Sequence, residues 1–298
     1  MDLIGDIGGT SARFALAEIG RVLTGTVWSA PDALGDDLAA MIHAYLAGPG
    51  AGARPRGVAL AGAGVLRGQR LTLSNRDMTL TPETIRAALG DAALPVRLFN
   101  DMVAQGHGLA HLPDGGVRRL AGPGPGKGPA LVVNIGTGLN ACVVHDMGGT
   151  RFVPPAEAGN VTLPQVSPGL RALALARGGE VVAEDVISGR GLPWLADAMC
   201  GARATGAAAL ALAPVCATLA EALAAYLRDM ALVHIARGGV YLTGGVAAAL
   251  ADSLDWAALH RAMVGQGAHA DLLGQVGLLH VTDPWVTLRG AAALSARP

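Results

Sequence analysis

Residues 3–17 decide the fold of this chain, and they read Leu3-Ile4-Gly5-Asp6-Ile7-Gly8-Gly9-Thr10-Ser11-Ala12-Arg13-Phe14-Ala15-Leu16-Ala17. The apolar run before Gly8 predicts a strand, and the alternation of Phe14 and Leu16 with small residues predicts a second one. The two glycines between them are typical of a tight turn. The chain therefore opens with a β-hairpin, which we expect a third strand over residues 22–28 to extend.

The turn of this hairpin carries residue types that suit a phosphate. Adjacent glycines allow positive φ and let successive backbone N–H groups converge on an anion, and the Thr10 hydroxyl can donate to a phosphoryl oxygen. Asp6 would repel a phosphate unless a Mg²⁺ ion lay between them, so we expect Asp6 to hold that metal through water. The alternative is a glycine-rich turn with a solvated Asp6, and the glycine pair alone favours it.

Two later glycine turns have the same features as this possible phosphate-binding turn. Residues 136–138 join predicted strands over residues 130–133 and 141–144, and residues 244–245 follow a predicted strand over residues 240–243. Three such turns on separate strands are typical of one nucleotide held between two lobes.

A fourth glycine-rich stretch does not fit this chemistry. Residues 121–128 are similar to a phosphate-binding P-loop but lack its first Gly and its final Ser or Thr, and two prolines remove N–H donors. We expect a surface loop there.

The rest of the chain alternates helices and strands. Apolar residues at helical spacing predict helices over residues 34–45 and 219–233. A strand over residues 96–99 ends at Asn100 and Asp101, and functional side chains gather at such strand ends. These elements predict two α/β lobes, each opening with a β-hairpin.

Composition excludes several classes of protein. The 298 residues carry 22 Lys and Arg against 23 Asp and Glu, so no basic face is available for nucleic acid. The longest stretches without an ionisable side chain are interrupted by Gly or Pro and are too short to span a bilayer. Asp2 and Asp6 near the start do not fit a secretory signal. We therefore expect a cytoplasmic protein that binds neither nucleic acid nor membrane.

Seven motifs, in order along the chain, resemble those of the bacterial ATP-dependent glucokinases. They are Gly5-Asp6-Ile7-Gly8-Gly9-Thr10, Leu73-Ser74-Asn75, Phe99-Asn100-Asp101, Gly136-Thr137-Gly138-Leu139, Glu157-Ala158-Gly159-Asn160, Glu184-Asp185-Val186-Ile187-Ser188-Gly189 and Tyr241-Leu242-Thr243-Gly244-Gly245. The resemblance covers essentially the whole chain. It implies an α/β, two-lobed actin-like (ribonuclease H-like) ATPase fold of the hexokinase type. It also implies transfer of the γ-phosphoryl group of ATP to the 6-hydroxyl of glucose, with Mg²⁺.

The resemblance also implies a role for each motif. The triphosphate would be held by Gly5, Asp6, Ile7, Gly8, Gly9, Thr10, Gly136, Thr137 and Gly138, with Gly244 and Gly245 by the adenosine. The sugar would be bound by Asn75, Asn100, Asp101, Glu157, Asn160 and Glu184, with Asp101 as catalytic base. These residue types suit a sugar, because carboxylates can accept and amides can accept and donate hydrogen bonds around a ring of hydroxyl groups. A carboxylate within reach of the attacking hydroxyl can take its proton.

Each carboxylate also has an ordinary structural interpretation. Asp101 can be the N-cap of a helix over residues 103–109 and still act as a base. Glu157 can be an exposed loop carboxylate, and Glu184 can be a first-turn acid favoured by its helix dipole.

Two residues depart from the family pattern. Asn160 stands where the family typically has His, so a kinase of another hexose or an amino sugar stays open. Asn140 stands where the family has Gly, and we expect it to be tolerated because Asn accepts positive φ better than most residues. A non-catalytic sugar-sensing relative is the other alternative. Such regulators usually add a helix-turn-helix segment, for which we expect no room before a hairpin that starts at residue 2.

The domain organisation follows from the same reading. We expect a small domain over residues 1–101 with about residues 285–298, and a large domain over residues 102–284. A homodimer stays open.

Overall fold

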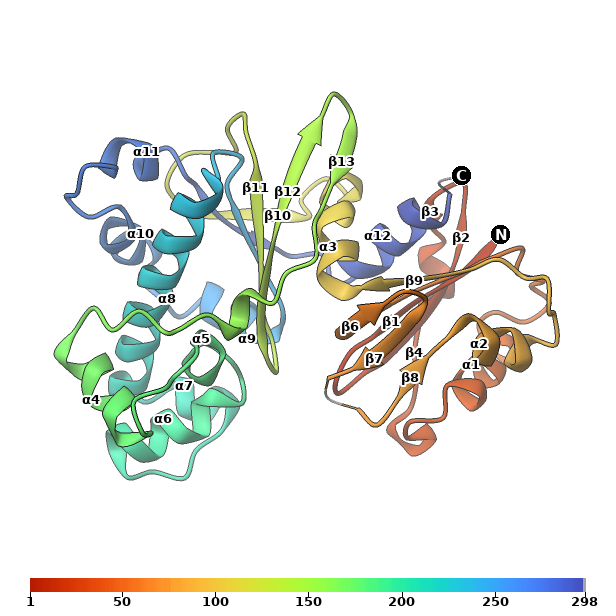
Figure 1. Ribbon diagram of the computed structural model, residues 1–298, viewed down its shortest axis with the longest axis horizontal. Coiled ribbons are helices and arrows are strands. Elements are labelled where there is room, and N and C mark those ends of the chain that lie inside the picture. The colour runs from red at the N-terminus through yellow and green to blue at the C-terminus, as the bar shows by residue number, and fades with distance from the viewer. Residues whose placement is uncertain (75, 297–298) are drawn as a thin grey trace. The chain divides into compact units, whose positions relative to one another are not determined.

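The computed structural model describes residues 1–74 and 76–296 and divides into two compact units (Figure 1). Unit 1 comprises Met1–Pro113 together with the segment from Asp283, and unit 2 comprises Asp114–Thr282. Each unit is built on its own six-stranded sheet.

Unit 1 is a sheet of order β3-β2-β1-β5-β9, with β4 paired to β2, and a separate three-stranded sheet β6-β7-β8. Its strands are β1 (Asp2–Ile7), β2 (Ala12–Glu18), β3 (Arg21–Val22), β4 (Trp28–Ser29), β5 (Val58–Gly62), β6 (Gly64–Arg67), β7 (Arg70–Leu73), β8 (Thr79–Leu80) and β9 (Val96–Asn100). Its α-helices are α1 (Leu38–Ala47), α2 (Pro82–Leu89), α3 (Asp101–Gly108) and α12 (Val286–Ser295).

The main sheet of unit 1 is buried on both faces because its strands alternate between two cores. On β1, Leu3 and Ile7 pack in the core that also contains apolar residues of α1 and α2. Ile4 lies on the opposite face and packs with Leu288 and Ala291 of α12. The period of two along a strand thus directs neighbouring residues to different helices.

Unit 2 is a sheet of order β10-β15-β14-β11-β12-β13 packed on helices around one large core. Its strands are β10 (Val117–Ala121), β11 (Ala130–Ile135), β12 (Leu139–Met147), β13 (Thr150–Phe152), β14 (Val240–Thr243) and β15 (Leu278–Val281). Its α-helices are α4 (Pro168–Ala176), α5 (Ala183–Val186), α6 (Gly191–Cys200), α7 (Gly206–Leu210), α8 (Ala213–His234), α9 (Gly245–Ala251), α10 (Trp256–Val264) and α11 (Ala270–Gly274). No helix of the described chain is long and apolar enough to cross a membrane.

The two sheets share one topology. In unit 1 the antiparallel hairpin β1–β2 continues through β5 and β9, which pair in parallel with β1 and with each other. In unit 2 the hairpin β11–β12 continues in the same way through β14 and β15. The prediction of α/β units that each open with a hairpin is confirmed.

Several predicted elements differ from the structure in detail. The third strand expected over residues 22–28 is broken by the 3₁₀ turn Thr24–Thr26, because the Thr26 hydroxyl accepts from Leu16 N and donates to the Leu23 carbonyl. The helix expected from residue 34 starts at Leu38, because the Asp37 side chain caps it through Ala40 N.

The division of the chain also falls elsewhere than the expected boundary after residue 101. Helix α3 belongs to unit 1 and packs closely on α12. Their backbones approach so closely that a Cβ at Gly290 would overlap the Ala104 carbonyl, and a Cβ at Gly108 would overlap the Val286 carbonyl. The two glycines therefore set the spacing of this helix pair.

We predict that Gly290→Ala destabilises unit 1 by about 2 kcal/mol or more, because an added methyl must push α3 and α12 apart. Thermal unfolding followed by circular dichroism should show a midpoint lower by about 4 °C or more. Gly25→Ala is the matched control in the same unit, because a Cβ at Gly25 would meet no heavy atom within 4 Å and the φ of Gly25 is not positive. Equal midpoints for the two variants would contradict this account of the helix contact.

Candidate functional site

In unit 1 the candidate residues gather at the carboxyl edge of the parallel strands. Ile7 of β1 is in register with Gly62 of β5, and Gly62 is in register with Asn100 of β9. Parallel strands end at the same edge, and two strand spacings amount to about 10 Å. The turn after Ile7 and the helix start at Asp101 therefore lie on one edge of this sheet.

The first glycine turn is closed by the backbone of the hairpin itself. Gly8 N donates to the Ser11 carbonyl at 2.8 Å, and Ile7 pairs with Ala12. Neither Gly8 nor Gly9 has positive φ, so the turn does not use the left-handed backbone that glycine allows. Two residues, Gly9 and Thr10, lie between the two bonded residues.

Asp6 lies just before this turn, in surroundings that disfavour an isolated carboxylate. Burial raises the pKa of Asp6, while the Arg13 guanidinium and a hydrogen bond from Thr287 lower it. The nearest Arg13 nitrogen is 4.0 Å from the carboxylate. A buried carboxylate oxygen is the ligand type that Mg²⁺ prefers, and Mg²⁺ usually keeps several waters. The residues present therefore fit a Mg²⁺ ion held by Asp6 through water.

Asn100, a predicted sugar ligand, is tied into the fold. Its Oδ1 accepts from Met102 N at 2.9 Å and from Val103 N at 3.4 Å, and its Nδ2 donates to the Gly64 carbonyl at 3.0 Å. Asn100 is thus the N-cap of α3, and the interpretation of Asp101 as the cap is wrong by one residue.

Asp101 is the first residue of α3 and is half-buried. The N-terminal end of a helix stabilises a negative charge, because its free N–H groups point toward it. Asp101 therefore lies where the helix end favours a negative charge. Asn75, another predicted sugar ligand, lies outside the described residues.

In unit 2 the second and third glycine turns lie at the carboxyl edge of the parallel strands of its own sheet. Asn134 of β11 is in register with Thr243 of β14, so the turns that follow these strands are neighbours. Gly244 has a φ of 93°, and a Cβ there would overlap the Asn134 Oδ1 atom and the Ile135 carbonyl. Glycine is therefore required at residue 244 for both conformation and space.

The second glycine turn is fixed by the connection between α5 and α6. Gly136 N donates to the Gly138 carbonyl at 2.9 Å, and the Gly136 carbonyl accepts from Gly189 N at 2.8 Å. The Thr137 carbonyl accepts from Arg190 N at 3.1 Å. Thr137 is exposed at the tip of the turn, where its hydroxyl can meet a ligand.

Glu184 on α5 is held against this turn. One carboxylate oxygen accepts from Leu139 N at 2.8 Å, and the other accepts from the Arg190 guanidinium. Each oxygen keeps a further lone pair. The arrangement leaves Glu184 able to accept from hydroxyl groups.

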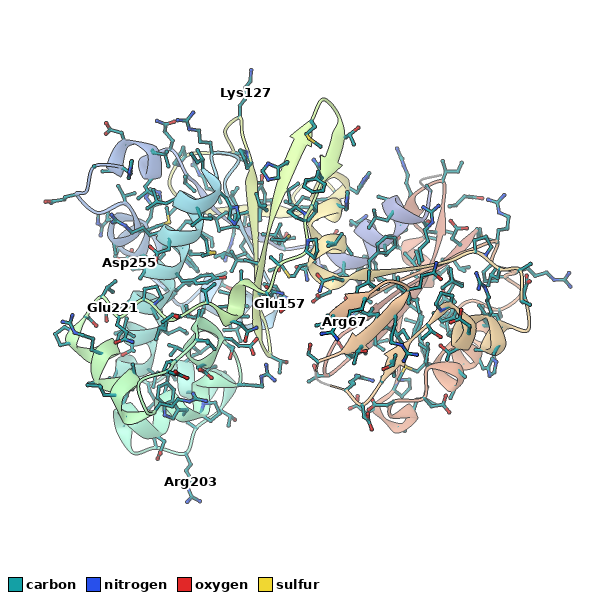
Figure 2. All side chains as sticks on the ribbon, viewed as in Figure 1. Arg67, Lys127, Glu157, Arg203, Glu221 and Asp255 are labelled. Atoms are coloured by element: carbon teal, nitrogen blue, oxygen red, sulfur yellow. The ribbon has the colours of Figure 1, made fainter. Side chains whose placement is uncertain are left out.

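Glu157 and Asn160 lie on the neighbouring segment, at the 3₁₀ turn Ala158–Asn160, and both are exposed. Figure 2 labels Glu157. Desolvation raises the pKa of Glu157, and the negative charge of Glu184 raises it further. Unit 2 thus brings together Glu157, Glu184 and the turn at residues 136–138.

The structure adds contacts that the sequence did not predict. Arg190 pairs with Glu184, Asn140 contacts the Glu157 segment, and the Tyr226 hydroxyl donates to the Ala158 carbonyl at 3.1 Å. These contacts join residues that are 6 to 68 positions apart. Their spacing gives no signal, although Asn140 stood out as a departure from the family pattern.

The stretch similar to a P-loop lies away from these residues. It connects β10 to the start of β11, and Lys127 projects from the end of the β11 hairpin opposite to the turn at residues 136–138 (Figure 2). The expectation of a surface loop is confirmed.

Comparisons with known proteins agree with this geometry. The glucokinase family model matches residues 3–298. The glucokinase of Aromatoleum aromaticum is 32% identical, with 97% of this chain and 93% of that protein covered. A glucokinase structure from an Antarctic psychrotroph is similar with a TM-score of 0.80 at 24% identity, covering 98% of this chain and 97% of that one.

A further solved structure carries ligands. The ROK family glucokinase from Streptomyces griseus, in complex with glucose and AMPPNP, has a TM-score of 0.65 at 20% identity, with 98% of each chain covered. The repeated topology and these likenesses confirm the actin-like ATPase fold of the hexokinase type. The chain is an enzyme that belongs to the glucokinase family.

Proposed function

We propose that this enzyme transfers the γ-phosphoryl group of ATP to the 6-hydroxyl of glucose. The observation that carries the proposal is the placement of a helix-start carboxylate and of two further carboxylates beside glycine turns, on the carboxyl edges of both sheets. Family membership supports the reaction class, and the S. griseus relative bound to glucose and AMPPNP supports the two substrates.

Sugar binding is assigned to groups that can accept and donate hydrogen bonds in pairs. Glu157 and Glu184 accept from sugar hydroxyls, and the Asn160 amide can do both. The ion pair with the Arg190 guanidinium orients Glu184. Asn75 is proposed as a fourth contact on the resemblance alone.

Asp101 is proposed as the general base. Its carboxylate accepts the proton of the 6-hydroxyl as that oxygen attacks the γ-phosphorus, while the bond from phosphorus to the bridging oxygen of ADP breaks. Asn100 acts indirectly, because its side chain caps α3 and fixes the residue that follows. We therefore assign Asn100 to positioning Asp101 rather than to direct contact with the sugar.

The nucleotide is assigned to the glycine turns. Backbone N–H groups of residues 9–10 and 137–138 donate to phosphoryl oxygens, because those of Gly8 and Gly136 are used within their own turns. Gly244 and Gly245 leave space for the nucleoside. A Mg²⁺ ion held by Asp6 through water would neutralise charge on the phosphates when bound. Because ATP is supplied in the cytoplasm, we place the enzyme there.

A related activity is favoured by one residue. Asn160 is exposed beside Glu157 and is an amide where a His is typical, so the hydrogen bonds offered to one sugar hydroxyl differ. Turnover of another hexose or an amino sugar is the second candidate function. A coupled assay of ADP release over a panel of hexoses, with ATP and Mg²⁺, distinguishes the two.

We predict that Asp101→Asn lowers kcat about 100-fold to 10,000-fold, because the amide cannot take the proton of the attacking hydroxyl. Glucose binding measured by calorimetry should be largely retained, since the amide has the same shape.

The control for this variant is Asp91→Asn in the same unit. Asp91 is exposed and accepts from Ala93 N at 2.9 Å, a bond that an amide oxygen preserves. Its kcat should match that of the natural enzyme. An Asp101→Asn variant that keeps more than about a tenth of the natural kcat would remove Asp101 from the role of base.

We also predict that Asn160→His adds a titration to the activity profile. An imidazole is neutral above about pH 6.5 and charged below it, whereas an amide does not titrate. The kcat/KM for glucose, measured from about pH 5.5 to 8.5, should gain a step near neutrality, with binding near pH 8 at least as tight. Identical profiles and unchanged affinity would place Asn160 outside the sugar site.

A further inference from the structure

Asn140 lies on the strand that follows the turn at residues 136–138, and its side chain contacts the segment that carries Glu157. It is the second residue of β12, two positions after Gly138, and it pairs across the hairpin with Asn134. Its side chain is half-buried. A polar side chain at this place must find partners, because an unpaired buried amide costs free energy.

The partners of Asn140 lie on both sides of Glu157. Its Nδ2 donates to the Ala156 carbonyl at 2.9 Å, and its Oδ1 accepts from Ala158 N at 2.9 Å. A longer contact of 3.5 Å joins the same Nδ2 to a carboxylate oxygen of Glu157. One amide thus holds the backbone before and after the carboxylate that we assign to sugar binding.

Other contacts bring the segment against the same strand. A Cβ at Gly159 would overlap the Leu139 carbonyl, so the segment passes directly over the β12 backbone. The Tyr226 hydroxyl of α8 donates to the Ala158 carbonyl at 3.1 Å. Both contacts lie after Glu157. Of the contacts made by Asn140, Gly159 and Tyr226, the Asn140 contact also reaches Ala156, the residue before Glu157.

We propose that Asn140 is a positioning residue that fixes Glu157 for sugar binding and ties its segment to the strand that follows the turn at residues 136–138. This inference rests on the proposed function, since it names a further determinant of that same sugar site. Asn140 acts through the backbone of Glu157 and needs no contact with the sugar.

The charges around Glu157 make the donor half of the amide important. Glu184 of α5 is the acidic neighbour, and Arg190, the residue before α6, pairs with one of its carboxylate oxygens. The Tyr226 hydroxyl faces the segment from α8. An aspartate at residue 140 keeps an acceptor for Ala158 N. It loses the donor to Ala156 and adds a negative charge next to Glu157.

The test uses Asn140→Ala and Asn140→Asp in the full-length enzyme. For Asn140→Ala we expect the KM for glucose to rise roughly tenfold, as for the loss of a hydrogen-bonded anchor, with kcat and the KM for ATP changed much less. For Asn140→Asp we expect a similar rise, and the acidic limb of kcat/KM should move to higher pH because a second negative charge makes Glu157 harder to ionise.

A second readout does not depend on activity. Amide hydrogen exchange of peptides that cover residues 155–161 should be faster in both variants, with a smaller effect for Asn140→Asp, because it keeps the acceptor for Ala158 N. Should Asn140→Ala fail to fold, Asn140→Asp carries the test alone, since its shape is nearly the same.

The matched control is Ser167→Ala, which removes the Ser167 Oγ acceptor of Leu170 N at the start of α4. It lowers stability in the same unit without touching the Glu157 segment, so its KM for glucose should equal that of the natural enzyme. A glucose KM unchanged in both Asn140 variants, or raised equally for glucose and ATP, would overturn the inference. Absence of glucose turnover in the natural enzyme would instead overturn the proposed function, and hydrogen exchange would still decide the positioning role.

Discussion

Parallel pairing of each hairpin with the strands that follow it is the constraint on which the rest of the structure depends. In unit 1, Ile7, Gly62 and Asn100 are in register, and in unit 2, Asn134 and Thr243 are in register. Because parallel strands end at one edge, every turn that follows them lies on that edge. The topology therefore places the glycine turns and the acidic side chain of Asp101 at these edges.

Hydrogen bonds then decide what each of these groups can do. The Asn100 amide is used by the backbone of α3, and Asp101, the residue proposed as base, follows it where the helix end favours a negative charge. Glu184 has a backbone N–H and a guanidinium, whereas desolvation and Glu184 both raise the pKa of Glu157. The two glutamates of unit 2 thus have different partners and surroundings.

Much of this could be predicted from the sequence because it depends on local pattern. The strands predicted at residues 3–7 and 240–243 are confirmed, since short apolar runs bounded by glycine turns are short-range signals. The cap of α3 was placed one residue late, at Asp101 in place of Asn100, because Asn and Asp cap equally well and their order alone does not show where the helix begins. The pairings of Glu184 with Arg190 and of Asn140 with the Glu157 segment depend on how distant segments pack, which no local pattern encodes.

In the proposed function, the residues at these strand ends transfer the γ-phosphoryl group of ATP to the 6-hydroxyl of glucose. The most direct measurement is carbon and phosphorus NMR of the product formed from glucose labelled with ¹³C at carbon 6, ATP and Mg²⁺ by the natural enzyme. The account predicts one phosphate monoester whose phosphorus couples to the labelled carbon, with one ADP formed for each. A product phosphorylated at another carbon, or ADP formed at the same rate without glucose, would contradict it.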